Sequence, residues 1–179
     1  MTRATATDLY TLASDIRAEL VQGKLEIIPF RGAIPANASG IILASLFEFS
    51  QHQNGRAYPS KVVYLVGLAH RESFSPDVSY HTGPRAEMRF LEGAPIFAVE
   101  VRSEHDYGPG AERAMAQKRA DYFACGTLVV WDVDLLSDEV VRSYRVDQPY
   151  TPTVFRRGEV ANAIPALEDW TLEVNRLFL

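Results

Sequence analysis

The chain has little cysteine, little lysine and no excess of positive charge, and each shortage excludes a class of protein. The single Cys125 excludes an internal disulfide and a cysteine-rich zinc site, and it is typical of a reducing cytoplasm. The 18 basic residues stand against 23 acidic ones, for a net charge of −5. This balance argues against tight non-specific binding of nucleic acid, which depends on Lys and Arg neutralising phosphates. A local cationic cleft remains compatible with it.

Long hydrophobic runs are also missing. The N-terminal residues MTRATATDLY lack the apolar core of a signal peptide. No apolar run approaches the roughly 20 residues of a membrane span. We therefore expect a cytoplasmic protein that does not enter a membrane. The length of 179 residues predicts one domain, residues 1–179, with a hydrophobic core of its own.

Hydrophobic spacing predicts alternating helices and strands, with one tight turn near the start. Residues 7–20 have the spacing of a first helix that Thr7 or Asp8 would cap. Gln22-Gly23, between two apolar runs, predicts a tight hairpin turn. Further along we expect a loop at residues 29–35 and a second helix that starts at Asn37 or Ser39 and buries Ile42, Leu46 and Phe49. We also expect a polar connection at 83–93 and a closing apolar segment at 164–179. The predicted strands are 61–66, 77–81, 95–101, 127–133, 139–146 and 152–155.

The stretch from Pro76 to Asp134 organises the rest of the chain. It predicts a strand after Pro76, a second strand carrying Glu100 near its end, a helix from about Gly110 to Gly126, and a third strand. This order is typical of an α/β fold. A carboxylate at the end of an otherwise apolar strand is costly to bury, so such a group usually meets a cation or a metal.

Asp77 and Glu100 form the first candidate pair. If their strands are neighbours, the two carboxylates can converge on one Mg²⁺, which prefers oxygen ligands. Two alternatives stay open for them. Asp77 could simply start a strand after Pro76, and Glu100 could form an ion pair with an arginine such as Arg102.

Lys118 interrupts a largely apolar helix face that should point toward the sheet. It is one of only three lysines in the chain. A lysine above the two carboxylates would stabilise a pentavalent phosphate. The alternative is a lysine that extends past the helix edge to reach solvent. Helical spacing places on the same face Ala111, Ala114, Met115, Tyr122 and Cys125.

Taken together, these motifs resemble one family. The pattern has a Pro-Asp pair, an apolar strand ending in E-V-R-S, an acidic loop, a helix with lysine and tyrosine, and a downstream strand with tryptophan. Upstream, residues 19–26 read E-L-V-Q-G-K-L-E, similar to the family's hairpin. With these features, most of the chain resembles the "Uma-two" family of endonucleases, within the PD-(D/E)XK superfamily.

The resemblance implies a fold and a set of site residues. The fold is a restriction-endonuclease-like core, a mixed central β-sheet flanked by helices, with an N-terminal helix and β-hairpin. Asp77 and Glu100 are implied to be ligands of Mg²⁺ or Mn²⁺, and the backbone carbonyl of Val101 a third oxygen. The superfamily's lysine two residues after the glutamate is here Arg102, which is not a simple replacement. The family often carries this lysine on the following helix, and Lys118 is the only lysine after Glu100.

Other polar residues are weaker candidates, each with a structural alternative. Glu19 or Glu26 could reach the metal, or be solvated strand acids. Ser103, with Asp106 nearby, could bind a phosphate oxygen or cap a turn, and His105 is a possible base or an exposed loop residue. Tyr122 and Trp131 are expected in the core.

Two functions follow from these observations. The first is a metal-dependent endonuclease that hydrolyses phosphodiester bonds, with DNA favoured as substrate and Asp77, Glu100 and Lys118 as catalytic residues. A homodimer would fit such an enzyme, and an exposed strand such as Glu139 to Val146 could form its interface. The second is a catalytically inactive nuclease fold serving protein–protein interaction or regulation, which the acidic balance and Arg102 favour.

Overall fold

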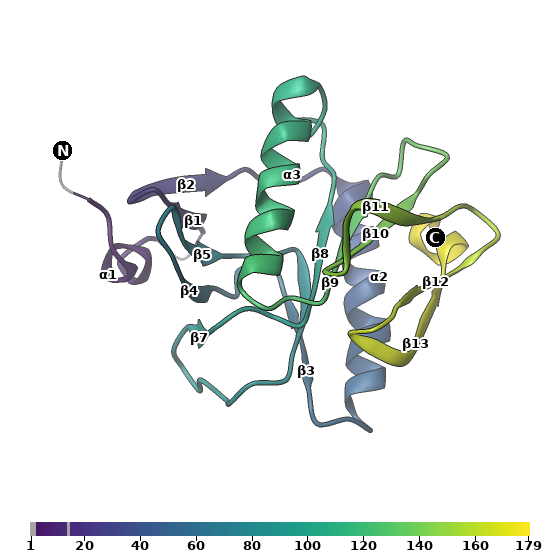
Figure 1. Cartoon of the computed structure of the whole chain (residues 1–179), viewed down its shortest axis with the longest axis horizontal. Helices are drawn as coiled ribbons and strands as arrows, with labels where there is room; N and C mark the ends of the chain where they lie inside the picture. Colours follow the sequence, from purple (N-terminus) through teal and green to yellow (C-terminus); the bar gives the residue numbers. More distant parts are fainter. Residues whose placement is uncertain (1–2, 14) are drawn as a thin grey trace.

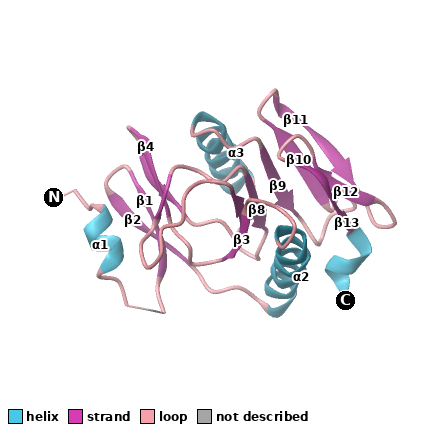
Figure 2. Cartoon of the chain, turned by 90° about the horizontal axis from the view of Figure 1, so that it is seen from below, coloured by secondary structure: helices cyan, strands magenta, loops and turns pink. Residues whose placement is uncertain are grey.

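A six-stranded mixed sheet lies between two long helices at the centre of the molecule (Figures 1 and 2). The computed structural model describes residues 3–13 and 15–179. The sheet order is β11-β10-β9-β8-β6-β3, and β8 and β9 are its one parallel pair. The predicted mixed sheet flanked by helices is therefore present. Its parts are β3 (Arg56–Pro59), β6 (Val78–His81), β8 (Phe97–Val101), β9 (Val129–Val133), β10 (Val141–Arg145), β11 (Gln148–Phe155), α2 (Ala33–Ser50) and α3 (Pro109–Ala124).

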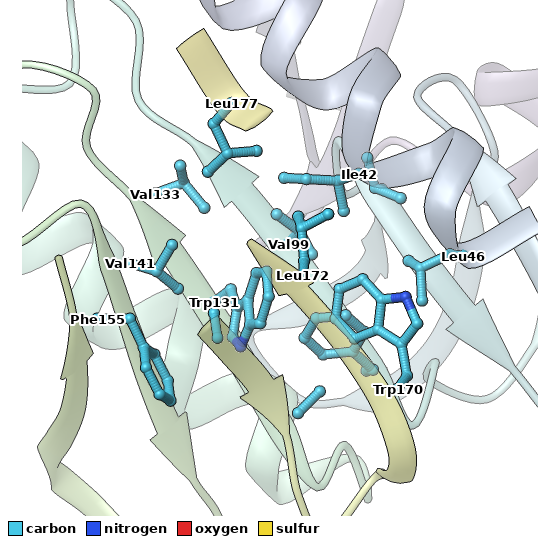
Figure 3. Close-up of a cluster of buried hydrophobic side chains, with 14 of the residues drawn as sticks. Ile42, Leu46, Val99, Trp131, Val133, Val141, Phe155, Trp170, Leu172 and Leu177 are labelled. Atoms are coloured by element: carbon cyan, nitrogen blue, oxygen red, sulfur yellow. The ribbon is translucent and has the colours of Figure 1, made fainter. Parts of the chain in front are cut away.

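The main core lies between the central sheet and α2. Side chains alternate along a strand, so every second residue of β8 and β9 faces α2. Among these, Trp131 lies with its ring centroid 5.2 Å from Phe97 and 5.0 Å from Trp170. Figure 3 shows Trp131 and Trp170 among aliphatic side chains from α2, the sheet and the C-terminal segment. That segment consists of β12 (Val160–Ala163), β13 (Leu167–Glu173) and the 3₁₀ helix η1 (Val174–Phe178).

A second sheet is built by the N-terminal part of the chain. Its order is β2-β1-β5-β4-β7, and it carries the short helix α1 (Ala6–Tyr10) beside it. Gln22 and Gly23 link β1 to β2 with φ values of 52° and 69°. Positive φ at both turn positions is what a two-residue hairpin requires, so the predicted hairpin is confirmed. The strands are β1 (Arg17–Val21), β2 (Lys24–Ile28), β4 (Tyr64–Leu68), β5 (Arg71–Phe74) and β7 (Leu91–Glu92).

Two helix boundaries differ from the prediction. The first helix ends at Tyr10, and Leu20 lies in β1, buried by the N-terminal sheet. Ser14, within the predicted helix, lies outside the described residues. The second helix begins at Ala33 rather than at Asn37 or Ser39. Pro35 was predicted to end the preceding loop, but it lies in the first turn of α2. The first turn of a helix tolerates a proline, because the N–H that proline lacks would have no helical partner there.

Strand prediction missed β3, β5, β7, β12 and β13 and misjudged β10. Four of the five missed strands have four residues or fewer, and β13 lies in the closing segment that was predicted only as apolar. The segment from Glu139 to Val146 was predicted to be exposed for dimerisation. In the structure β10 pairs with β9 on one side and β11 on the other. It therefore has no free edge, and this prediction was wrong.

Helix α2 is unusually apolar for its length. Its 18 residues carry one charge, that of Glu48, and by length and composition alone it is the one helix of the described chain that could cross a membrane. The prediction that no apolar run approaches the length of a membrane span is therefore wrong for α2 by this measure. In the fold, α2 places Ala38, Ile42 and Leu46 against the central sheet without exposure to solvent, so one face of the helix packs into the core.

Candidate active site

The register of two neighbouring strands brings Asp77 opposite Glu100. β6 and β8 are antiparallel, with Val78 paired to Val99, so the residue before Val78 stands across from the residue after Val99. The backbone N–H of Asp77 donates to the Val99 carbonyl at 3.0 Å. The Oδ2 atom of Asp77 accepts from the Val101 N–H at 2.7 Å. The two strands are therefore neighbours, which is the condition under which the two carboxylates could converge.

Lys118 of α3 reaches the same place from above the sheet. Its Nζ lies 2.9 Å from Oε1 of Glu100 and 2.8 Å from Oε1 of Glu19 on β1. The alternative in which Lys118 extends to solvent is wrong, because its side chain is 19% exposed and lies between two carboxylates. Tyr122, one helical turn later, donates its hydroxyl to Glu100 at 2.8 Å. Tyr122 is buried in the core as predicted, and its hydroxyl belongs to the site.

Burial and neighbouring charges set the protonation of this group. Burial raises the pKa of the Glu100 carboxyl; Lys118 opposes this, and Asp77 and Glu19 help to keep the pKa above its ordinary value. Burial would lower the pKa of the Lys118 ammonium, but Glu100 and Glu19 outweigh it and raise that pKa. Burial alone would raise the pKa of the Glu19 carboxyl, but Lys118 and Arg71 lower that pKa by more, so it lies below its ordinary value. Lys118 is therefore a fixed cation at neutral pH, and Glu19 is its ionised partner.

Asp77 is surrounded by arginines rather than by acids. Nη1 of Arg17 lies 2.9 Å from its Oδ1, and Arg31 forms an ion pair with its Oδ2. The same Nη1 of Arg31 donates to the Val101 carbonyl oxygen at 2.5 Å. Two of the three predicted metal-ligand oxygens thus converge on one cationic nitrogen. Asp77 does begin a strand, as the structural alternative held, and it is also buried with these cations.

Arg102, two residues after Glu100, contacts other acids than Glu100. It shares the α3-facing side of β8 with Glu100, but its guanidinium binds Asp132 on β9, with bonds of 2.8 and 2.7 Å. It also binds Glu112 at the start of α3. The alternative in which Glu100 pairs with Arg102 is therefore wrong. Arg102 instead connects β8, β9 and the first turn of α3.

A cavity of about 220 Å³ lies beside these side chains. It is bounded by α3, by β8 and β9, and by the N-terminal hairpin. Its lining includes Glu19, Glu26, Glu100, Val101, Lys118 and Tyr122.

Comparison with known proteins identifies the family of the chain. The family model "Uma2: Putative restriction endonuclease" matches residues 6–175. The chain belongs to the Uma2 family. This is the "Uma-two" family that the sequence motifs resemble, and the prediction is confirmed.

A solved structure shares the fold. It is described as a "putative nuclease belonging to DUF820 from Anabaena variabilis ATCC 29413". The match covers 96% of this chain and 94% of that one, with a TM-score of 0.75 and 19% sequence identity. At this identity the likeness supports the fold alone. The comparison with curated proteins gives no match.

The weaker candidates separate into site and surface residues. Glu19 is 5% exposed and belongs to the site, whereas Glu26 on the next strand is exposed and lies only at the cavity. Ser103 binds Asp106 through its hydroxyl and its N–H, which is a turn cap. The side chain of His105 is 65% exposed, as expected of a loop histidine. Trp131 is in the core, as predicted.

The arginines of the site were not among the predicted site residues. Arg17 fell within the helix predicted over residues 7–20, whereas in β1 it lies two residues before Glu19 and so on the same face of the strand. Arg31 lies in a connection, and Arg71 lies on a strand that was not predicted. Arg71 binds Glu19 and Asp121 at 2.8 Å each, which ties the N-terminal sheet to α3. These partners lie 50 or more residues apart, and no local pattern signals such pairs.

The oxygen atoms near Arg31 fit a hard divalent cation in type. Among the described residues, no group of three or more His, Cys, Asp or Glu side chains has the arrangement of a metal site. However, a carboxylate oxygen of Asp77 and the carbonyl oxygen of Val101 already meet at one cation, the Arg31 guanidinium. Carboxylate and carbonyl oxygens are ligands that Mg²⁺ and Ca²⁺ accept. Glu100, the third predicted ligand, faces Lys118.

Proposed function

We propose that the chain is a metal-dependent endonuclease that hydrolyses phosphodiester bonds of nucleic acid, with DNA favoured as substrate. The observation that carries the proposal is the contact of Lys118 with Glu100, at the point where Asp77 stands across from Glu100. Membership of the Uma2 family supports the reaction class. The order of β6, β8, α3 and β9 supports a restriction-endonuclease-like core.

In this proposal Asp77, Glu100 and the Val101 carbonyl hold Mg²⁺ or Mn²⁺. When bound, such a cation polarises a phosphoryl oxygen and lowers the pKa of a bound water. The residues of the chain contribute charge and position. Lys118 keeps its proton, because two carboxylates raise its pKa, so it stabilises negative charge on the phosphate rather than taking a proton. Tyr122 holds Glu100 in place through its hydroxyl.

The test is cleavage of several nucleic acids by purified protein. Supercoiled plasmid, linear duplex DNA, single-stranded DNA and RNA are each incubated with Mn²⁺, with Mg²⁺ or with a chelator. We expect cleavage with metal only, and a loss of about 100-fold or more in rate for Asp77→Asn, Glu100→Gln and Lys118→Met. Matched controls are Glu104→Gln, whose side chain is 84% exposed, and Lys24→Met on the exposed side of β2. Cleavage that survives all three site substitutions would refute the proposal.

One observation favours the second function, an inactive nuclease fold that binds or regulates another protein. Each of the three site carboxylates, of Glu19, Asp77 and Glu100, already has a cationic partner in the chain. Absence of cleavage on every substrate, together with absence of Mn²⁺ binding, would select this function. A homodimer and a cytoplasmic location remain predictions. If two copies pair through a strand, the edge strands of the central sheet are β3 and β11.

A further inference from the structure

Arg31 occupies the position that the proposed cation needs. Its Nη1 contacts Oδ2 of Asp77 and, at 2.5 Å, the carbonyl oxygen of Val101. A guanidinium is a monovalent cation with fixed donors, and these donors here satisfy the same oxygen atoms that a divalent ion would require. A metal ion and the Arg31 side chain therefore cannot bind these two oxygens at the same time.

Arg31 also divides the site into two cavities. The cavity of about 220 Å³ is lined by Glu100 and Lys118, and a second cavity of about 310 Å³ is lined by Asp77 and Arg17. Arg31 lines both of them. With Arg31 in place, Asp77 and Glu100 open onto different cavities, although they belong to neighbouring strands. Withdrawal of this one side chain would expose the two carboxylates to one common space.

The charges around the site point in the same direction. Four carboxylates and four cations form two groups of ion pairs there, one around Asp77 and one around Lys118 and Arg71. Without Arg31 the two groups together have one excess negative charge, which favours a cation from solution. The four acids are Glu19, Asp77, Glu100 and Asp121, and the four cations are Arg17, Arg31, Arg71 and Lys118.

The backbone around Arg31 leaves its side chain room to withdraw. Residues 29–32 connect β2 to α2, and the pairing of β1 with β2 ends at Ile28. Helix α2 begins only after Gly32, its N-terminal cap residue. The neighbouring Phe30 is 85% exposed, so it does not anchor the connection in the core. Movement of Arg31 therefore breaks neither the hairpin nor the helix.

We propose that Arg31 is a built-in competitor of the divalent cation, which holds the site closed without metal and must withdraw for metal to bind. This inference rests on the proposed metal site at Asp77, Glu100 and Val101. It adds that removal of the Arg31 side chain should strengthen metal binding, whereas removal of a ligand such as Asp77 should abolish metal binding.

The experiment is a calorimetric titration of Mn²⁺ into four proteins without nucleic acid. They are the wild type, Arg31→Met, Arg17→Met and the double variant Arg31→Met with Asp77→Asn. We expect Arg31→Met to lower the Kd at least about tenfold, because charge-assisted hydrogen bonds no longer compete with the ion. Arg17→Met removes the same charge from the other oxygen of Asp77 but leaves Arg31 on the two ligand oxygens, so we expect the Kd to change no more than about threefold. The double variant should lose binding.

Each outcome decides between the two proposals. Equal Kd values for the wild type and Arg31→Met would overturn the competition and leave the metal site standing. An equal gain from Arg17→Met would also overturn it, since the effect would then be one of charge alone. No Mn²⁺ binding by any of the proteins would overturn the metal site and the competition with it.

A second measurement uses only the wild-type protein, so it does not depend on the folding of a variant. Trypsin cleaves after arginine, and the bond from Arg31 to Gly32 is a potential site. We expect saturating Mn²⁺ to increase the rate of cleavage there at least about threefold, because the side chain leaves Asp77 and Val101. Cleavage after Arg113, an exposed arginine of α3, is the internal reference. A rate at Arg31 that Mn²⁺ leaves unchanged, or slows, would contradict the proposal.

Discussion

The two faces of β8 and β9 are made by alternate residues of the same strands, yet they differ in kind. The face toward α2 carries Phe97, Val99 and Trp131, which pack into the main core. The face toward α3 carries Glu100 and Asp132, each bonded to a cation of another element. Figure 2 shows the two helices on opposite sides of these strands. One sheet thus supports a dry core on one side and an ionic site on the other.

The two faces are expected to respond differently to substitution of a side chain. On the apolar face a side chain touches many neighbours, so the loss of one contact is shared and the cost depends on the volume removed. On the ionic face each charge depends on one or two partners, and the loss of a partner leaves a buried charge without compensation. Four substitutions, with successively smaller expected losses of stability, test this contrast.

Trp131→Ala tests the apolar face. Trp131 is fully buried, and its replacement should leave a cavity between β9, α2 and β13. We expect the free energy of unfolding to fall by about 3–5 kcal/mol, measured by urea denaturation. Met88→Ala, at a position 98% exposed, is the control and should change little. A loss of less than about 1 kcal/mol in the free energy of unfolding of Trp131→Ala would show that this face is not the main core.

Arg102→Met tests the ionic face. It removes the two short bonds to Asp132 and leaves that carboxylate buried, with Arg119 3.6 Å away as its remaining cation. We expect a loss of about 3 kcal/mol in the free energy of unfolding. The double variant Arg102→Met with Asp132→Leu should recover part of that loss, because the buried Asp132 charge is gone, while Arg119 loses this carboxylate and keeps its contact with the Tyr144 ring. A double variant as unstable as the sum of two single variants would instead mean that shape, not charge, dominates on this face.

Tyr122→Phe tests a single bond of the site. The variant keeps the ring, which stacks on Phe74 with centroids 4.0 Å apart, and removes only the hydroxyl that donates to Glu100. We expect a loss of about 1 kcal/mol in stability, seen as a lower midpoint of thermal unfolding. Tyr150→Phe, with a ring 91% exposed, should leave the midpoint in place. An unchanged midpoint for Tyr122→Phe would show that this bond adds nothing to stability.

Glu112→Gln tests the outermost contact of the ionic face through pH. The hydrogen bond from Arg102 lowers the pKa of Glu112 below its ordinary value of 4.5. A lowered folded-state pKa adds stability above pH 4.5, and this stability disappears as pH falls through the folded-state pKa. We expect the wild type to be more stable than the variant by about 0.5 kcal/mol at neutral pH, and the difference to vanish in acid. A difference that stays constant as pH is lowered from neutral into the acid range would exclude this carboxyl as its source.

Part of the site could be predicted from spacing and resemblance. Helical periodicity placed Lys118 toward the sheet, and the strand pattern and family resemblance selected Asp77 and Glu100. The structure brings Lys118 to Glu100 and sets Asp77 across from Glu100. The roles of these residues in catalysis remain predictions. The sequence shows that Arg102 stands two residues after Glu100, but it does not show what Arg102 binds. Its partner Asp132 lies on another strand, 30 residues further along the chain.

The sequence by itself determined the features whose physical cause is local. Alternation along β8 and β9 follows from the two-residue period of a strand, and the Gln22-Gly23 turn follows from the backbone conformations that those residues tolerate. Which cation pairs with which carboxylate depends on the tertiary structure. Arg17 and Arg31 reach Asp77 from 60 and 46 residues away along the chain, by the difference of their numbers. Such ion pairs depend on distance in space, and no periodicity along the chain records that distance.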